Sequence, residues 1–308
     1  MLRALTTRPE DETEAILAVI ARADADILVL GDVDWDHTHT GLTALQAKLA
    51  GLGRSYPHMW FPKPVSGQPS GFDLDGDGRL GEREDNLGYG RFTGDNGVAL
   101  LSRLPLRNGR THHDILWASR GDLTGLVPDG AAAILPLTSA AMWEVEVAGL
   151  TLIGFANTAP TFDGPEDRNG VRNKDQLAFL AERAQKVHLP VLLGRTNLDP
   201  FDGDGARGAI QALLNHPTLQ DPRPASAGGR MASNPANHQG DPSLDTADWQ
   251  DGPGPLRVDV VLPSVDLTVT EAGVLWPAPD DPFAAVVAQS GANRLVWVDV
   301  TLPPPDDR

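Results

Sequence analysis

The chain contains no cysteine, so it can form neither a disulfide nor a reactive thiolate. This absence does not decide between a reducing and an oxidising compartment. No apolar run reaches the roughly 20 residues that a membrane-spanning helix needs. The first residues, Met1 to Leu5, also lack the apolar stretch of a secretory signal peptide. We therefore expect no transmembrane segment and no signal peptide within this chain.

Basic residues are scarce as well. The 308 residues include 25 Lys and Arg against 42 Asp and Glu, which gives a net charge of −17. Proteins that bind nucleic acids or anionic membranes without specificity need a basic face. We therefore expect nonspecific nucleic-acid binding to be absent. The acidic excess suits a protein that binds cations.

Glycine and proline are abundant, with 32 and 26 residues, and 41% of the chain is hydrophobic. This composition predicts a sizeable core whose elements are joined by long loops. Apolar spacing predicts helices at 8–23, 42–52, 173–186 and near 206–214. It predicts strands at 26–30, 97–102, 143–147, 150–155, 191–193, 257–262, 267–269 and 295–300. The segments 57–93 and 221–254 have the composition of loops, and 103–141 is irregular.

Strands and helices interleave along the chain, but the predicted hairpin at 143–155 and the adjacent closing strands imply antiparallel pairing. This pattern favours an α/β protein with two packed sheets flanked by helices over an all-parallel sheet. One buried strand, Val191 to Leu193, is followed directly by Arg195 and Asn197. Because α/β sheets place ligands at the carboxyl ends of their strands, these two residues are candidate site residues.

Six segments, in this order along the chain, resemble the endonuclease/exonuclease/phosphatase superfamily: DILVLGDVDWD, GDNGVALLSRLPL, FANTAPTFDGPEDRNGVRNKDQ, PVLLGRTNLDPFDGDG, LRVDVVLPS and NRLVWVDV. The resemblance implies a four-layered α/β/β/α sandwich of two mainly antiparallel or mixed sheets. It implies one domain over residues 1–308, with an insertion at about 57–93. It also implies that the family's first strand, which carries a catalytic Asn, would precede Leu2. The FDGPEDRNG and DLDGDGR segments resemble those of exported bacterial members, which implies an extracellular or periplasmic location.

The resemblance also implies a chemistry. In the family, carboxylates hold Mg²⁺, a His–Asp pair activates water, and a second His stabilises developing charge. Three remnants of that site are identified by position: Asp32, Asn197 and Asp259. At the family's remaining His and Asp positions this chain carries other residues: Ala156, Arg195, Ala292 and Asn293.

Both imidazoles are thus missing and one charge is reversed, which predicts a degraded active site. One hypothesis is a pseudoenzyme in which Arg195 and Asn197 bind an anionic ligand; alternatively Arg195 only pairs with Asp259 or Asp32. A second hypothesis is a divergent Mg²⁺-dependent phosphoesterase that uses the three remnants. A third is an interaction subunit whose open sheet edge a protein partner fills. His37 and His39 follow Asp32 but are expected to be exposed loop residues.

The segment 72–84 reads FDLDGDGRLGERE and matches the twelve-residue calcium loop. Its ligand positions one, three, five, seven and twelve are Asp73, Asp75, Asp77, the carbonyl of Arg79, and Glu84. Without a cation, three close carboxylates repel one another, so we predict that loop 73–84 binds Ca²⁺. A solvated acidic turn is the alternative. Flanking helices are not evident, which favours a calcium-stabilised loop over a helix-pair sensor. The second Asp/Gly stretch, 199–205, lacks this pattern and is expected to form a turn.

Overall fold

The computed structural model describes Leu5 and residues 11–302. The helices are α2 (Asp11–Ala23), α3 (Thr40–Gly51), α4 (Arg168–Lys186), α5 (Arg207–Leu214), α6 (Ala227–Met231) and α7 (Ala284–Gln289), with 3₁₀ turns η1 (Trp117–Ser119), η2 (Ala131–Ala133) and η3 (Pro242–Leu244). The strands are β1 (Ile27–Val33), β2 (His58–Trp60), β3 (Gly97–Ser102), β4 (Leu106–Thr111), β5 (Ala141–Val147), β6 (Leu150–Ala156), β7 (Pro190–Arg195), β8 (Ala247–Trp249), β9 (Gly254–Leu256), β10 (Asp259–Pro263), β11 (Thr268–Leu275) and β12 (Leu295–Thr301).

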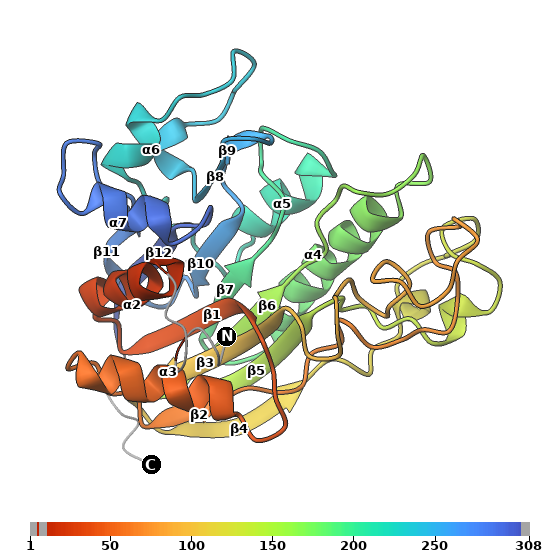
Figure 1. Cartoon of the computed structure of the whole chain (residues 1–308), viewed down its shortest axis with the longest axis horizontal. Helices are drawn as coiled ribbons and strands as arrows, with labels where there is room; N and C mark the ends of the chain where they lie inside the picture. The colour runs from red at the N-terminus through yellow and green to blue at the C-terminus, as the bar shows by residue number, and fades with distance from the viewer. Residues whose placement is uncertain (1–4, 6–10, 303–308) are drawn as a thin grey trace.

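Two sheets occupy the centre of the molecule (Figure 1). One has the strand order β1-β3-β2 and the other β10-β7-β6-β5-β4, while β11–β12 and β8–β9 form small hairpins. Strands β6 and β7 are parallel, and α4 makes the crossover between them. The other strand pairs are antiparallel, so the sheets are mixed as predicted.

Side-chain alternation on β3 sorts its residues between two apolar layers. Ala99 and Leu101 pack with residues of α2 and α3. Val98 and Leu100 point the other way, against strands of the second sheet. The first sheet is therefore covered by helices on one face and by a sheet on the other.

The second sheet repeats this arrangement in mirror order. On β6, Leu150 and Leu152 face the first sheet, whereas Ile153 and Phe155 pack against α4 and α5. The layers consequently run helix, sheet, sheet, helix, with α2 and α3 on one side and α4 on the other (Figure 1). This confirms the predicted α/β/β/α architecture.

Trp143 on β5 ties the two sheets together. Its ring is fully buried, and its indole Nε1 donates a hydrogen bond to the Val98 carbonyl of β3 at 3.0 Å. Gly154 lies opposite on β6, where a Cβ would come within 2.2 Å of the Trp143 ring. Glycine is therefore required at position 154 for the indole to lie between the sheets.

The expected elements differ from the observed ones at several places. The predicted loop 57–93 contains β2, the irregular segment 103–141 contains β4, and the predicted loop 221–254 contains α6, η3 and the hairpin β8–β9. These strands are short and lack clear alternation, so only pairing with neighbouring strands establishes them. The first predicted helix is observed from Asp11, and its residues 8–10 lie outside the described residues.

Helix α4 begins at Arg168, five residues before the predicted start at Asn173. The carboxylate of Asp163 accepts a hydrogen bond from the Asn169 backbone N–H at 2.5 Å, so it supplies a partner for a free donor of the first turn. Within the described residues, no helix is long and apolar enough to cross a membrane.

Candidate functional site

Strand β7 brings the predicted site residues together. Arg195 is its last residue and is paired with Ala156 on β6 and with Asp259 on β10. Asn197 follows in a left-handed backbone conformation, with φ of 53°. One end of the five-stranded sheet therefore brings together four positions named from the sequence: Ala156, Arg195, Asn197 and Asp259.

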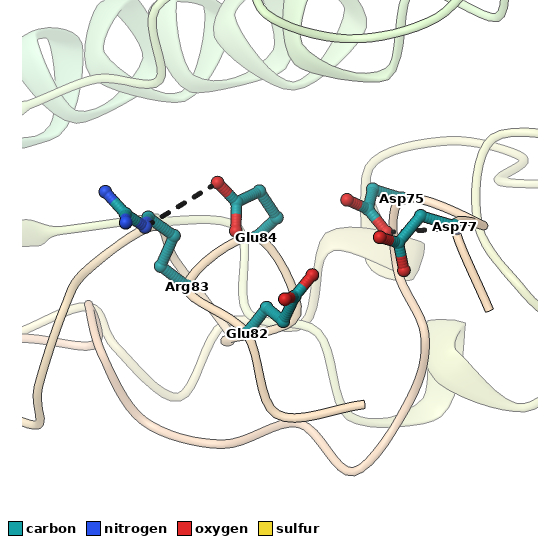
Figure 2. A pocket seen from close by; sticks show the side chains of 5 residues that line it. All are labelled: Asp75, Asp77, Glu82, Arg83 and Glu84. Carbon is teal, nitrogen blue, oxygen red and sulfur yellow. Dashed lines mark hydrogen bonds and ion pairs between the residues drawn. The ribbon is translucent and has the colours of Figure 1, made fainter. Parts of the chain in front are cut away.

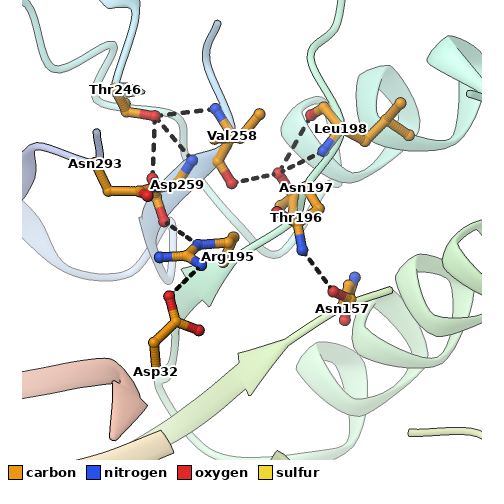
Figure 3. Close-up of polar contacts among 10 residues, drawn as sticks. All are labelled: Asp32, Asn157, Arg195, Thr196, Asn197, Leu198, Thr246, Val258, Asp259 and Asn293. Atoms are coloured by element: carbon orange, nitrogen blue, oxygen red, sulfur yellow. Dashed lines mark hydrogen bonds and ion pairs between the residues drawn. The ribbon is translucent and has the colours of Figure 1, made fainter. Parts of the chain in front are cut away.

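Arg195 lies between two carboxylates that come from different sheets (Figure 3). Its Nη1 lies 2.7 Å from Oδ2 of Asp32, at the end of β1, and its Nε lies 3.4 Å from Oδ1 of Asp259. Burial alone would lower the pKa of Arg195, but the Asp259 and Asp32 charges outweigh it and raise the pKa above its ordinary value. The guanidinium is thus a permanent internal counter-ion. The structure contains the ion pairs with Asp32 and Asp259, and the anionic-ligand role of Arg195 stays a prediction.

Asn293 stands beside Asp259, where the family pattern places an imidazole. Its Nδ2 donates to Oδ2 of Asp259 at 2.8 Å, and the Thr246 hydroxyl lies 3.4 Å from the same oxygen (Figure 3). A carboxamide neither gains nor loses a proton near neutral pH, so it orients Asp259 without moving protons. The carbonyl of the preceding Ala292 accepts the Asp248 N–H at 3.0 Å, which makes that position structural.

Asn197 is also engaged by the protein. Its Nδ2 donates to the Asn157 carbonyl at 2.7 Å (Figure 3). Asn157 was not singled out from the sequence, yet both polar atoms of its own buried side chain lack a hydrogen-bond partner. Its position directly after Ala156, at the end of β6, was the available signal. A ligand role for Arg195 and Asn197 stays a prediction, because their hydrogen bonds here go to protein groups.

The residues present do not fit a Mg²⁺ ion at this position. Asp32 and Asp259 are the carboxylates that would hold the metal, but the Arg195 guanidinium lies between them. A second cation placed against an arginine is electrostatically unfavourable. In the described part of the chain, the hydrogen bonds and ion pairs of Asp32, Arg195 and Asp259 include no histidine. His37 and His39 contact Trp35 instead, with ring centroids 6.3 and 6.2 Å away.

The predicted calcium loop lies in the irregular segment beside α4, in the orange loops of Figure 1. Asp73 accepts hydrogen bonds from the Gly76 and Gly78 N–H groups at 2.8 and 2.9 Å, and these glycines have φ of 76° and 85°. The carboxylate of Asp77 accepts the Arg79 N–H at 2.8 Å. The backbone therefore wraps around its acidic side chains in a tight turn.

Across a hollow of about 480 Å³, Glu82 and Glu84 face Asp75 and Asp77 (Figure 2). Glu84 also pairs with Arg83, 3.8 Å away. Burial, together with the nearby charges of Asp77 and Asp85, raises the pKa of Asp75. A cation in this hollow would relieve that repulsion.

Asp85 is an acidic residue that the loop pattern did not identify. Oxygens of Asp73, Asp75 and Asp85 lie within 4.8 Å of one another, whereas Glu84 is not part of that group. Both Asp85 oxygens accept backbone hydrogen bonds, including one from Leu74 at 2.8 Å. The only sequence signal was a second carboxylate directly after position twelve. The ligand roles of Asp77, Arg79 and Glu84 stay predictions.

A family model described as the Endonuclease/Exonuclease/phosphatase family matches residues 5–297. Among curated protein sequences, none matches. A solved endonuclease/exonuclease/phosphatase from Beutenbergia cavernae is 19% identical with a TM-score of 0.57; the match covers 95% of this chain but 66% of that one.

Two further solved structures resemble nearly the whole chain. A 3′ phosphatase, NExo, from Neisseria bound to a product DNA hairpin is 17% identical, with a TM-score of 0.54 and coverage of 94% and 93%. The human Nocturnin catalytic domain with a bound sulfate is 17% identical, with a TM-score of 0.52 and coverage of 95% and 87%. At these identities the likeness concerns the fold.

Proposed function

We propose a function that starts from the family assignment: this chain belongs to the endonuclease/exonuclease/phosphatase family. In this proposal, the chain is a non-catalytic member that serves as a calcium-stabilised binding or structural module. Members of the family are metal-dependent phosphoesterases or nucleases. The observation that carries the proposal is the position of Arg195. Its guanidinium forms ion pairs with both Asp32 and Asp259, the two carboxylates that a catalytic metal ion would need.

The loss of proton-transfer groups supports the same proposal. Ala156 has no titratable atom, and Asn293 offers an amide where a general base would have to take a proton from water. General acid–base catalysis contributes about 10²–10⁴-fold to rate, so its loss alone makes turnover very slow. Removal of the metal site adds to that loss.

An assay of phosphodiester hydrolysis tests the proposal. The full chain is incubated with a chromogenic phosphodiester and with Mg²⁺, Mn²⁺ or Ca²⁺ in turn. We expect no turnover above that of the Asp32→Ala variant with any of the ions. Metal-dependent turnover that disappears in Asp32→Ala would instead establish the divergent phosphoesterase, in which Asp32, Asn197 and Asp259 remain functional.

The acidic loop supports the calcium part of the proposal. Calcium takes six to eight hard oxygen ligands, and this loop offers carboxylates from Asp73, Asp75, Asp77 and Glu84, with Asp85 nearby. Calorimetry on chelator-stripped protein should detect one site, with a dissociation constant of about 10⁻⁴–10⁻³ M if it resembles extracellular modules.

A matched pair of variants locates this site. Asp75→Asn should abolish the binding heat, because it removes a charged ligand from the hollow. Asp204→Asn removes the same charge from the other Asp/Gly loop, where the Asp204 carboxylate accepts a hydrogen bond from the Gly205 N–H, and should leave binding unchanged. Equal loss in both variants, or no binding heat in the unmodified chain, would exclude a calcium site in loop 73–84.

The binding role is supported by two apolar strands at sheet edges. Among the described residues, β1 pairs with β3 alone and β12 with β11 alone. Both strands carry consecutive apolar residues, Ile27–Leu30 and Leu295–Val298, of the kind found in strands with neighbours on both sides. Such edges can pair with a strand of a protein partner.

A further inference from the structure

His238 lies between two buried carboxylates in a region that no sequence motif marked. Its Nδ1 is 3.4 Å from Oδ2 of Asp202, and its Nε2 is 3.6 Å from Oδ2 of Asp245. The three side chains are 7%, 10% and 2% exposed. The imidazole therefore connects the loop 199–205, which follows Asn197, with the segment 234–245, which leads into β8.

Two of the facing atoms have no hydrogen-bond partner. Nε2 of His238 and Oδ2 of Asp245 are both buried and unpaired, and they face each other. A carboxylate oxygen and a neutral ring nitrogen each present a lone pair, so their approach is unfavourable unless a proton lies between them. On the other side, Asp202 is held in place by the Gln239 and Gly240 N–H groups at 2.9 and 2.8 Å.

The surroundings of this pair are negatively charged. Four carboxylates repel a negative charge on Asp245. Asp199 and Asp202 lie on the loop after β7, Asp241 lies on the same segment as Asp245, and Asp248 lies on β8.

Arginines offset two of these carboxylates: Arg223 lies 3.8 Å from Asp241, and Arg294 interacts with Asp248. Arg257 donates to Asp221 instead, at 2.6 and 2.9 Å. Among the ion pairs of the described residues, Asp245 has the His238 imidazole as its partner, so a retained proton lowers the charge at Asp245 itself.

We propose that Asp245 keeps a proton directed at the facing Nε2 of His238, and that this buried proton holds segment 234–245 in its closed conformation, in which His238 faces Asp202 of loop 199–205; we call this arrangement the latch. In the latched state, the proton lies between Oδ2 of Asp245 and Nε2 of His238, while the opposite ring nitrogen faces the Asp202 carboxylate. When the proton leaves to solvent, the Asp245 carboxylate is left against the Nε2 lone pair and the neighbouring acids. Segment 234–245 then opens to solvent, because in the closed conformation the ionised Oδ2 of Asp245 is buried without a hydrogen-bond donor.

The pKa of Asp245 agrees with this geometry. Burial, followed by the charges of Asp199 and Asp202, raises it from 3.8 to about 8. The latch is therefore closed at neutral pH and opens as the pH rises above about 8. By linkage, the stability from this raised pKa is fully present below 3.8 and is lost as the pH rises through about 8.

Opening of the latch would loosen the support of the Arg195 cluster, that is, Asp32, Arg195, Asp259 and Asn293. Segment 234–245 continues into Thr246, whose hydroxyl accepts hydrogen bonds from the Val258 and Asp259 N–H groups at 2.9 Å. The inference is independent of the proposed function, because it holds whether or not the cluster is catalytic.

Hydrogen–deuterium exchange on the full chain between pH 7 and pH 9 tests the latch. We expect amides of segment 234–245 to exchange about tenfold faster at pH 9 than the intrinsic pH effect explains. Asp245→Asn keeps the shape but cannot ionise, so its segment should stay protected at both pH values. Asp248→Asn removes a neighbouring charge without removing the proton of Asp245, and should retain a pH-dependent opening.

Nuclear magnetic resonance of carboxyl-labelled aspartate provides a second readout, with Asp245→Asn used to assign the signal. The Asp245 carboxyl signal should shift between pH 7 and pH 9 in the unmodified chain, because its pKa is raised to about 8. Equal protection of segment 234–245 at pH 7 and pH 9 in the unmodified chain would overturn the proposal. An Asp245 carboxyl signal that does not change between pH 7 and pH 9 would overturn it as well.

Discussion

At the scale of single residues, Arg195 changes what the end of β7 can do. A carboxylate at position 195 would add a third negative charge beside Asp32 and Asp259, and a metal ion would then be needed to offset the repulsion. The guanidinium of Arg195 instead forms an ion pair with each of the two carboxylates. Arginine suits this role because its charge persists at all physiological pH values and its donors fan out in one plane. Arg195 thus joins carboxylates of two different sheets through ion pairs within the protein.

Replacement of Arg195 by methionine should destabilise the protein. Asp32 and Asp259 would then face each other without a counter-ion, at a cost of about 1–3 kcal/mol, between that of an exposed and a fully buried pair. Urea denaturation at pH 7 measures the change. Arg223→Met is the matched control, because that side chain is 60% exposed and lies 3.8 Å from Asp241; its cost should be near zero. Equal effects of the two variants would contradict a structural role for Arg195.

At the scale of elements, helix α4 anchors the segments that precede it. Arg172, on its buried face, donates to the carbonyls of Leu87, Pro136, Leu137 and Thr138 at distances of 2.6 to 3.1 Å. The guanidinium also lies over the Trp117 ring, 5.5 Å from its centroid. One side chain therefore connects α4 with Leu87, in the segment 57–93, and with the irregular segment 103–141.

The variant Arg172→Met should lower the free energy of unfolding by about 2–4 kcal/mol, because it strips several buried carbonyls of their donor. Thermal denaturation followed by circular dichroism measures the loss. The neighbouring Lys174→Met lies on the exposed face of the same helix and should change stability by less than about 0.5 kcal/mol. Limited proteolysis should cut the 57–93 segment faster in Arg172→Met alone; equal cleavage in both would refute the anchoring role.

At the scale of the whole molecule, the net charge of −17 opposes binding to nucleic acids. The likeness to a 3′ phosphatase bound to a DNA hairpin concerns the fold, and this chain carries that fold with an acidic composition. A shared architecture therefore does not transfer the ligand.

We accordingly expect no retardation of a random-sequence DNA duplex in a gel-shift assay at physiological salt and protein concentrations up to about 10⁻⁴ M, where nonspecific binders associate. Charge repulsion should keep this true at lower ionic strength. Retardation that weakens with added salt would reveal a local basic face and contradict the expectation.

Much of the fold followed from local patterns. The strands at 26–30 and 97–102 and the hairpin at 143–155 were identified because their apolar residues repeat with the strand period or form buried runs. Strands β2 and β4 were missed because short, partly exposed strands depend on neighbours that the local pattern does not contain. Arg195 and Asp259 were identified as neighbouring site positions, and β7 and β10 place them side by side.

By itself, the sequence determined the layered architecture, the acidic surface, and the absence of imidazole at positions 156 and 293. Each of these depends on residue type or on spacing along the chain. Only the tertiary structure decided that Arg195 pairs with Asp32, that Asp85 joins Asp73 and Asp75, and that His238 lies between Asp202 and Asp245. The reason is physical: side-chain alternation selects the face on which a residue lies, but the packing of distant segments selects which charges share a buried space.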